Sequence, residues 1–557
     1  MLSDKLMRKC LYILGLMLVS CSVLFAQERV YVSTDKDVYV AGENLWCSVY
    51  CIDAATGEYS GLSDVAYLQF VSREGVAATH KVALVDGRGC GVFQIPLDFA
   101  TGNYSIVSYT KAYGGDSEGE FNGKIISVFN TVSAKRVKDG VTVGDAVPGK
   151  GALGQNGDIA VKVGEQRGSV VPVKIGNKGD EAMQLSVSVY HMDGLEELSG
   201  SYNRSSLLER KGNFGQLDEV DYWGEIVRVK VSAKDGGNCA GKYVYMSAVG
   251  NTDDVYVNKV GEDGIAVFHT GNVMGRRDLV FEVLDDSKSV AQGASSKDTA
   301  SKYDIEILQK GYKREVAEIP QLGISIEMDN ALKERNRRMQ ISRRFEADTL
   351  LDMCRKKDNS FVGDTKPLVY NLDEYTRFSN LEETLREYVN FVRVRRVGGT
   401  TQMKVLWETQ GRCLALLDGI PVSDHYTILR LDQQLVKQIV VYPRRYMLNH
   451  FIYDGIVNFV TYRGDMGGIS LPKNVSVVGF DGVSWPVAIL GGKVANEGDY
   501  PNFLSTIYWN PTVEIPAGGE FEFDCVLPLY KGKFKVVVEG LQGTGKEVYV
   551  VGGFNTH

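Results

Sequence analysis

Cysteine and histidine are scarce in this sequence, and their scarcity excludes several kinds of site. The 557 residues include nine cysteines and six histidines. A disulfide-stapled fold would show dense, even-numbered cysteines, whereas only seven scattered ones follow residue 26. No two histidines stand at ligand spacing and no Cys-x-x-Cys occurs, so we expect no metal site and no cofactor. We expect the cysteines to be buried thiols that act as small hydrophobic side chains.

A basic charge balance and long apolar runs are missing as well. Lys and Arg number 62 against 70 Asp and Glu, and this net charge of −8 argues against nucleic acid as a partner. After the first 26 residues, no apolar run reaches the roughly 20 residues that a membrane-spanning helix needs. Proline is rare at 13 residues while glycine reaches 61, and helical patterns are few, which indicates many β-turns.

Residues 1–26 have the features of a secretory signal peptide. They begin with a basic stretch around Lys5, continue with an apolar run and end on Ala26, a small residue suited to cleavage. A competing interpretation is the lipoprotein box Leu18-Val19-Ser20-Cys21, in which Cys21 would be lipidated and anchor the chain. The residues after Cys21 stay apolar, whereas a lipoprotein tether is usually polar. We therefore expect simple export, with membrane association through Cys21 or through a partner as the alternative.

Short alternating strands between glycine turns dominate the rest of the chain. Leu45–Tyr50 and Tyr104–Tyr109 are examples, and such regular short strands are typical of β-sandwiches. Helices are expected only at about 328–357 and from Ser379, which forms a capping box with Glu382. The predicted fold class is thus mostly β and multi-domain. The expected units are a signal peptide at 1–26, β-sandwiches at 28–135, 136–222 and 223–300, a linker with a basic helix at 301–370, an α+β domain at 371–468 and a C-terminal β module at 469–557.

Motifs that carry chemistry occur in the wrong context. A GxGxxG match at 149–154 has no helix behind it, and a GxSxG match at 115–119 lies in a polar turn. The segment 540–547 is one residue from a P-loop, but Glu547 replaces the Ser or Thr that would hold Mg²⁺, so we expect a hairpin turn there. No nucleophile, base and orienting group come together, so the sequence predicts that the protein is not an enzyme.

The first β unit carries a family resemblance. Val30–Lys36, Ala41–Glu43 and Leu45-Trp46 resemble the opening of the second macroglobulin-like domain of the alpha-2-macroglobulin family, and Gly102–Ile106 fits its closing strand. The resemblance implies a macroglobulin-like sandwich. The family's protease-trapping thioester needs a Cys-Gly-Glu-Gln motif, but Val163-Gly164-Glu165-Gln166 lacks the sulfur. The trapping mechanism therefore does not carry over.

The α+β segment carries a second resemblance. Leu416–Val422, Val436–Val441 and Gly455–Gly464 resemble, in this order, the plug domain of TonB-dependent outer-membrane receptors. In such receptors the plug fills a barrel of about 22 strands, and too few residues follow Asp465 for that barrel. The resemblance implies a plug fold without its pore.

Two weaker likenesses complete the picture. The unit 223–300 resembles small immunoglobulin-like or transthyretin-like sandwiches, and Thr506–Pro511 resembles the start of a terminal β module in Gram-negative envelope proteins. Together the resemblances imply an envelope protein that is exported to the periplasm or associated with the outer membrane.

These observations predict a non-catalytic scaffold or adaptor that binds another envelope protein or a polymer. The alternative is a ligand-binding accessory component of an outer-membrane, TonB-linked nutrient-uptake system. An enzyme built from distant residues and a protease inhibitor are further alternatives, and the oligomeric state stays open. The candidate contact residues are Arg337, Arg338, Arg343 and Arg344 on the basic helix, and Asp418, Gly419 and Pro421 in the plug-like turn.

Overall fold

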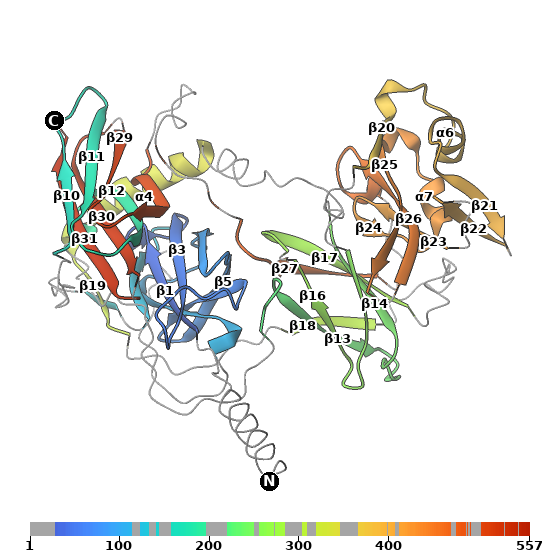
Figure 1. The fold of residues 1–557 in the computed structure, drawn as a ribbon, viewed down its shortest axis with the longest axis horizontal. Coiled ribbons are helices and arrows are strands. Elements are labelled where there is room, and N and C mark those ends of the chain that lie inside the picture. Colours follow the sequence, from blue (N-terminus) through green and yellow to red (C-terminus); the bar gives the residue numbers. More distant parts are fainter. Residues whose placement is uncertain are drawn as a thin grey trace, which may run out of the picture.

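The computed structural model has two lobes built mainly from β-sheets (Figure 1), which confirms the predicted mostly β, multi-domain fold class. The predicted signal peptide at 1–26, with Cys21, and the motifs at 115–119 and 149–154 lie outside the described residues. Within the described ranges, no helix is long and apolar enough to cross a membrane. The structure describes residues 28–113, 123–132, 141–143, 157–196, 220–249, 255–271, 273–284, 303–308, 319–345, 366–397, 399–406, 411–449, 451–468, 475–485, 487, 491, 503–528, 530–543 and 545–556.

The first sandwich occupies the N-terminal part of the described chain. Alternating apolar side chains from both of its sheets, such as Val32, Leu45 and Leu68, meet in one buried cluster. The predicted strands Leu45–Tyr50 and Tyr104–Tyr109 lie inside β3 and β7. One sheet has the order β1 (Glu28–Thr34), β3 (Asn44–Asp53), β6 (Arg88–Gln94), and the other has the order β2 (Val38–Val40), β8 (Lys124–Phe129), β7 (Gly102–Tyr109), β4 (Val65–Ser72), β5 (Gly75–Ala83).

The second sandwich joins strands from two distant parts of the sequence. Its central strand pairs Leu185 with Gly540 and Val187 with Val538. The expected units 136–222 and 469–557 are therefore not separate modules but two halves of one sandwich. Its sheets are β10 (Ile159–Val163), β11 (Val170–Asn177), β29 (Glu520–Val526), and β28 (Thr506–Ile515), β12 (Met183–Met192), β30 (Lys533–Gln542), β31 (Glu547–Asn555). β30 and β31 form the hairpin expected at 540–547.

The third sandwich extends beyond the expected 223–300 unit. β18 (Tyr303–Leu308) lies in the expected linker and pairs with β13 (Ile226–Ala233). β27 (Val475–Asp481) comes from the expected C-terminal module and pairs with β17 (Arg276–Leu284). The expected boundaries of the 223–300 unit were therefore wrong, because the sandwich also includes these two strands. They cover sheet edges that the strands within 223–300 would leave open. The sheets are β16 (Ile265–His269), β13 (Ile226–Ala233), β18 (Tyr303–Leu308), and β15 (Val255–Lys259), β14 (Tyr243–Ala248), β17 (Arg276–Leu284), β27 (Val475–Asp481).

The segment 368–468 forms the expected α+β domain. Its helix α6 is capped by Asn380, whose side chain accepts a hydrogen bond from the Glu383 N–H, so the cap lies one residue beyond the predicted Ser379. Asn is as effective an N-cap as Ser, which explains the shift. The elements are β20 (Leu368–Asn371), β25 (Val436–Leu448), β26 (Phe451–Thr461), β23 (Arg412–Leu417) and β24 (Ile420–Pro421) in one sheet, the hairpin β21 (Arg393–Val397) and β22 (Thr400–Lys404), and the helices α6 (Leu381–Tyr388) and α7 (His425–Leu429).

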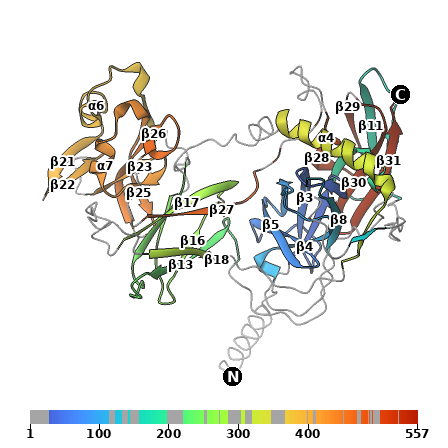
Figure 2. The same ribbon diagram turned by 180° about the vertical axis from the view of Figure 1, so that it is seen from behind.

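A long helix, α4 (Asp329–Phe345), lies across the lobe of the first two sandwiches (Figure 2). It agrees with the predicted basic helix in its first half, and 346–357 lies outside the described residues. It follows β19 (Leu322–Ile324), which pairs in parallel with β9 (Val141–Val143), and the short η3 (Ile326–Met328). The helix is therefore not part of a free linker, as the sequence suggested, but a packed element of the first lobe.

Candidate functional site

The four arginines predicted on the basic helix do not share one environment. Arg337, Arg343 and Arg344 are exposed and form no ion pair or hydrogen bond with the described part of the chain. Arg338 is half-buried, with its guanidinium 4.1 Å above the Tyr530 ring and 3.2 Å from His191 Nδ1. At 100° per residue, Arg337 and Arg344 lie on the outer face of α4, whereas Arg338 and Arg343 flank its packed face.

The packed face of α4 is centred on an arginine that the sequence analysis missed. Arg335 is only 2% exposed. Its Nε donates to Glu43 Oε1 at 3.1 Å, and its Nη2 donates to the Val38 carbonyl at 2.5 Å. Its Nη1 donates to Asp193 Oδ2 at 3.1 Å. Because Val38 and Glu43 belong to the first sandwich and Asp193 to the second, one guanidinium holds the helix to both.

The charges around Arg335 are mutually stabilised. Burial alone would raise the pKa of Glu43, but the cations of Arg335 and Lys36 outweigh it and lower that pKa. Burial would likewise lower the pKa of Arg335, but Asp193 and Glu43 raise it well above its ordinary value. The Glu43 carboxylate and the Arg335 guanidinium therefore stay ionised. The sequence signal was available, since Leu332, Arg335 and Met339 follow helical spacing on one stripe.

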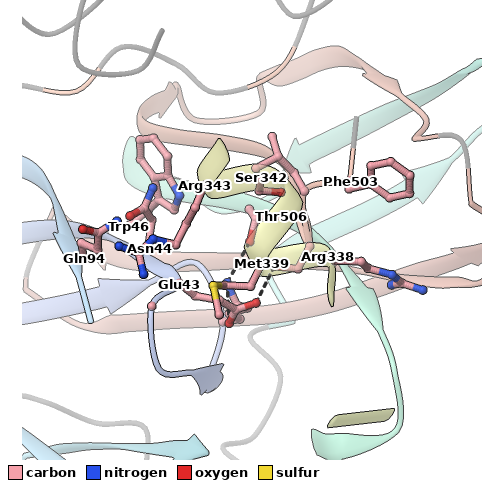
Figure 3. A pocket seen from close by; sticks show the side chains of 14 residues that line it. Glu43, Asn44, Trp46, Gln94, Arg338, Met339, Ser342, Arg343, Phe503 and Thr506 are labelled. Atoms are coloured by element: carbon pink, nitrogen blue, oxygen red, sulfur yellow. Dashed lines mark hydrogen bonds and ion pairs between the residues drawn. The ribbon is translucent and has the colours of Figure 1, made fainter. Parts of the chain in front are cut away.

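A small cavity lies beside this ion cluster, between α4 and the first sandwich (Figure 3). Its volume is about 60 Å³. Gly42, at φ +97°, allows the close approach, because a Cβ there would meet Met339 Sδ at 3.0 Å and Arg343 Nη1 at 3.1 Å. Its lining includes Asn44, Trp46, Gln94, Ser342 and Arg343.

A second buried charge joins the first two sandwiches. The Glu539 carboxylate accepts hydrogen bonds from Lys124 Nζ at 3.0 Å to each oxygen, and from the Tyr31 hydroxyl at 2.8 Å. Lys124 is 1% exposed and Glu539 is 2% exposed, so the pair is shielded from water. Breaking one partner of such a buried pair is strongly destabilising. The two sandwiches therefore form one firmly joined lobe.

The two lobes also meet through buried polar contacts. Lys81 of the first sandwich forms a 2.5 Å ion pair with Glu225, next to the third sandwich. Lys111 forms a 2.7 Å ion pair with Asp221, which also accepts a hydrogen bond from the Tyr67 hydroxyl at 2.7 Å. These contacts give the lobes specific, directional connections rather than a purely apolar interface.

The plug-like turn residues are structural elements of the α+β domain. Asp418 and Gly419, with φ of +51° and +83°, form the tight turn between β23 and β24 that the sequence predicted. The Asp418 carboxylate accepts hydrogen bonds from Thr461 N at 2.7 Å, Thr461 Oγ1 at 2.6 Å and Met466 N at 2.8 Å. Asp418 is 3% exposed and Pro421 is buried. Both are thus engaged inside the domain and offer a partner little surface.

The cysteines have the environment of structural thiols. Five cysteines are buried, which confirms the expectation of buried thiols for Cys47, Cys51, Cys239, Cys413 and Cys525. Cys90 is half-buried, and Cys354 lies outside the described residues. Burial raises the pKa of Cys413 to about 12. Within the described part of the chain, no cluster of three or more His, Cys, Asp or Glu side chains is placed to hold a metal ion.

No protein-family model and no curated protein matches this chain. Among solved structures, it is similar to trypsin-activated alpha-2-macroglobulin from Escherichia coli at 8% identity and a TM-score of 0.23, covering 95% of this chain and 41% of that one. Salmonella alpha-2-macroglobulin reacted with methylamine gives 8% identity and a TM-score of 0.23, covering 95% and 39%. The chain thus spans about two fifths of the length of these proteins. A likeness at this TM-score supports no conclusion about domain order or function. The resemblance of the α+β domain to a plug domain stays a prediction.

Proposed function

We propose that this protein is an exported, non-catalytic envelope protein that acts as a scaffold or adaptor for another envelope protein or a polymer. The observation that supports the proposal most is the division of α4 into two faces. Its inner face is fixed to two sandwiches by the buried Arg335, and its outer face presents Arg337 and Arg344, which form no ion pair or hydrogen bond with the described residues. A fixed helix with free cations is a surface suited to an acidic partner.

The charge balance of the chain makes this surface distinctive. The protein as a whole carries a net charge of −8, so an exposed basic face contrasts with the average surface. Charge complementarity of this kind mainly speeds association and selects the partner, and it weakens with salt. The buried ion pairs between domains support the scaffold part of the proposal, because they hold the modules in a defined arrangement.

A pull-down from envelope extracts tests the adaptor role. The tagged wild-type protein is compared with the double variant Arg337→Gln/Arg344→Gln. A matched control, Arg395→Gln/Arg444→Gln, removes two exposed arginines of the α+β domain that likewise have no ion pair or hydrogen bond among the residues that the structure describes. We expect a stoichiometric partner with the wild type and the control, and a much weaker, salt-sensitive recovery with the α4 variant. Repeated recovery of the bare protein would refute the proposal.

Mass spectrometry of the mature N-terminus tests export. We expect the mature chain to begin at Gln27, as cleavage after Ala26 requires. A diacylated Cys21 would replace soluble export with a membrane anchor. An intact Met1 would contradict both forms of the proposal.

One observation also supports the alternative role as a ligand-binding accessory component of a nutrient-uptake system. An open cavity of about 560 Å³ lies where the turn between β4 and β5 faces Pro320. This volume is within the range of small-molecule sites. Thermal-shift measurements with ferric siderophores and oligosaccharides test it. A rise in melting temperature with a ligand would favour this role, and no shift with any of them would count against it.

A further inference from the structure

The cavity beside α4 is lined by several side chains that can donate hydrogen bonds. Arg343 lies at its edge, beside Trp46 and Asn44, while Arg338 points to the opposite side of the helix (Figure 3). Asn44 and Gln94 add amide groups, and Ser342 adds a hydroxyl. None of the side chains of Arg343, Asn44, Gln94 and Ser342 makes a hydrogen bond or an ion pair with the described part of the chain. We call this set the Arg343 pocket.

The charge of the Arg343 pocket favours an anion. The cations Arg343 and Lys36 line it, of which Lys36 is already paired with Asp35 at 3.1 Å, and Glu43 is the carboxylate among its lining residues. Glu43 is already bound by Arg335, with Lys36 Nζ 3.9 Å away. The free guanidinium of Arg343 therefore has no carboxylate of its own in the cavity. A charge-assisted hydrogen bond to an incoming carboxylate would satisfy it.

The size and lining of the pocket select among anionic ligands. A volume of about 60 Å³ accommodates about two water molecules or one carboxylate group. Trp46 is only 3% exposed, so its indole offers no open face on which a sugar could stack. A single side-chain carboxylate from a protein fits both limits.

We propose that the Arg343 pocket is the anchor point of the adaptor surface and receives one Asp or Glu side chain of an acidic segment in a partner protein. The inference rests on the adaptor function proposed above and deepens it. Arg337 and Arg344 attract the acidic segment over the outer face of α4, and the Arg343 pocket fixes one of its carboxylates. Binding residues that fill a pocket near the centre of an interface commonly dominate its energy.

Fluorescence anisotropy with a labelled octaglutamate peptide tests the pocket, with octaglutamine as the uncharged probe. The key variant is Gln94→Glu, which is nearly isosteric and adds a fixed negative charge at the cavity. Gln434→Glu adds the same charge at an exposed site of the α+β domain and serves as its control. Ser342→Leu narrows the cavity and leaves every charge in place. Melting temperatures establish that each variant is folded.

We expect octaglutamate, but not octaglutamine, to bind the wild type. Gln94→Glu and Ser342→Leu should each weaken binding about tenfold or more, as expected for losing one hydrogen bond to a charged group, and Gln434→Glu should not. Unchanged binding in both pocket variants would refute the pocket. Absence of octaglutamate binding would also refute it, and the adaptor function would still stand if the pull-down recovers a partner that depends on Arg337 and Arg344.

Discussion

Replacing Arg335 with methionine should release α4 from the first lobe. Methionine has a similar length and preserves the helix propensity, so the change removes mainly the guanidinium. Glu43 would keep the distant Lys36 ammonium, at 3.9 Å, and hydrogen bonds from the Val40 N–H at 3.0 Å and the Ser505 hydroxyl at 3.4 Å, while Asp193 would lose its 3.1 Å ion pair. The buried Glu43 carboxylate and the half-buried Asp193 carboxylate would then lose the guanidinium that they share.

The expected cost follows from the burial of this cluster. Arg335 is 2% exposed and Glu43 is 7% exposed, so the lost contacts lie largely out of reach of bulk water. Removing one partner of a buried ion pair typically costs about 3–5 kcal/mol. Arg337→Met changes an exposed arginine two residues further along the same helix and should cost at most about 0.5 kcal/mol.

Hydrogen–deuterium exchange across 329–345 measures this cost locally, which suits a chain whose domains need not unfold together. A loss of about 3 kcal/mol would speed exchange in α4 by more than about a hundredfold. The same peptide in Arg337→Met should exchange as in the wild type. Equal protection of α4 in Arg335→Met and in the wild type would refute the conclusion that the guanidinium holds the helix in place.

Three further changes have defined outcomes. Gly42→Ala places a Cβ 2.9 Å from a leucine methyl in a residue whose φ is +97°. Hydrogen exchange in α4 should become faster, corresponding to a loss of about 1–3 kcal/mol in local stability. Unchanged exchange would mean that the turn adapts to the added methyl group. Asp418→Asn keeps the turn but loses the carboxylate that accepts three hydrogen bonds. Hydrogen exchange in β26 should become faster, corresponding to a loss of about 1–3 kcal/mol in local stability, and exchange in α4 should not change. Burial lowers the pKa of His425 from 6.5 to about 4, so the α+β domain should lose stability as the pH falls from 6.5 toward 4. Over this range, the stability of the domain, measured by hydrogen exchange, should depend less on pH in His425→Asn than in the wild type. An equal pH dependence in the two proteins would contradict the assignment.

Local features of the fold could be predicted from the sequence because their causes are local. The alternation of apolar and polar side chains in Leu45–Tyr50 predicts β3. The Asp418-Gly419 pair predicts a tight turn, because Asp and Gly both tolerate the positive φ angles that this turn has. The α6 cap was predicted one residue early, since Ser379 and Asn380 are both good N-caps. In each case neighbouring residues contain the information.

The domain boundaries could not be predicted because strand pairing across long separations leaves no local trace. Val187 pairs with Val538, and the alternation around each residue is the same whether its partner is near or far. β27 reads as the start of a C-terminal module, yet it completes the third sandwich beside β17. Consecutive segments in sequence were therefore assigned to consecutive domains, whereas the chain returns twice to sandwiches that it had left.

The sequence analysis selected four arginines of α4 as candidate contact residues and missed Arg335, which is buried at the packed face of the same helix. A run of arginines suggests a solvated or partner-binding face, so exposed cations drew the assignment. Arg335 differs from them only in its helical phase, which it shares with Leu332 and Met339. Its partners Glu43 and Asp193 are distant in sequence, so no local pattern marks their contacts with the guanidinium.

The two faces of α4 depend on each other. Arg337 and Arg344 lie about 10 Å apart along the helix axis, and that spacing is fixed only while the inner face stays docked. A preorganised pair of charges loses less conformational entropy on binding than two mobile side chains on a frayed helix. Arg335→Met should therefore weaken recovery of the acidic partner although every exposed arginine remains. If the partner binds this variant as strongly as the wild type while α4 exchanges rapidly, the arginines act as independent charges and the helix is not a rigid recognition element.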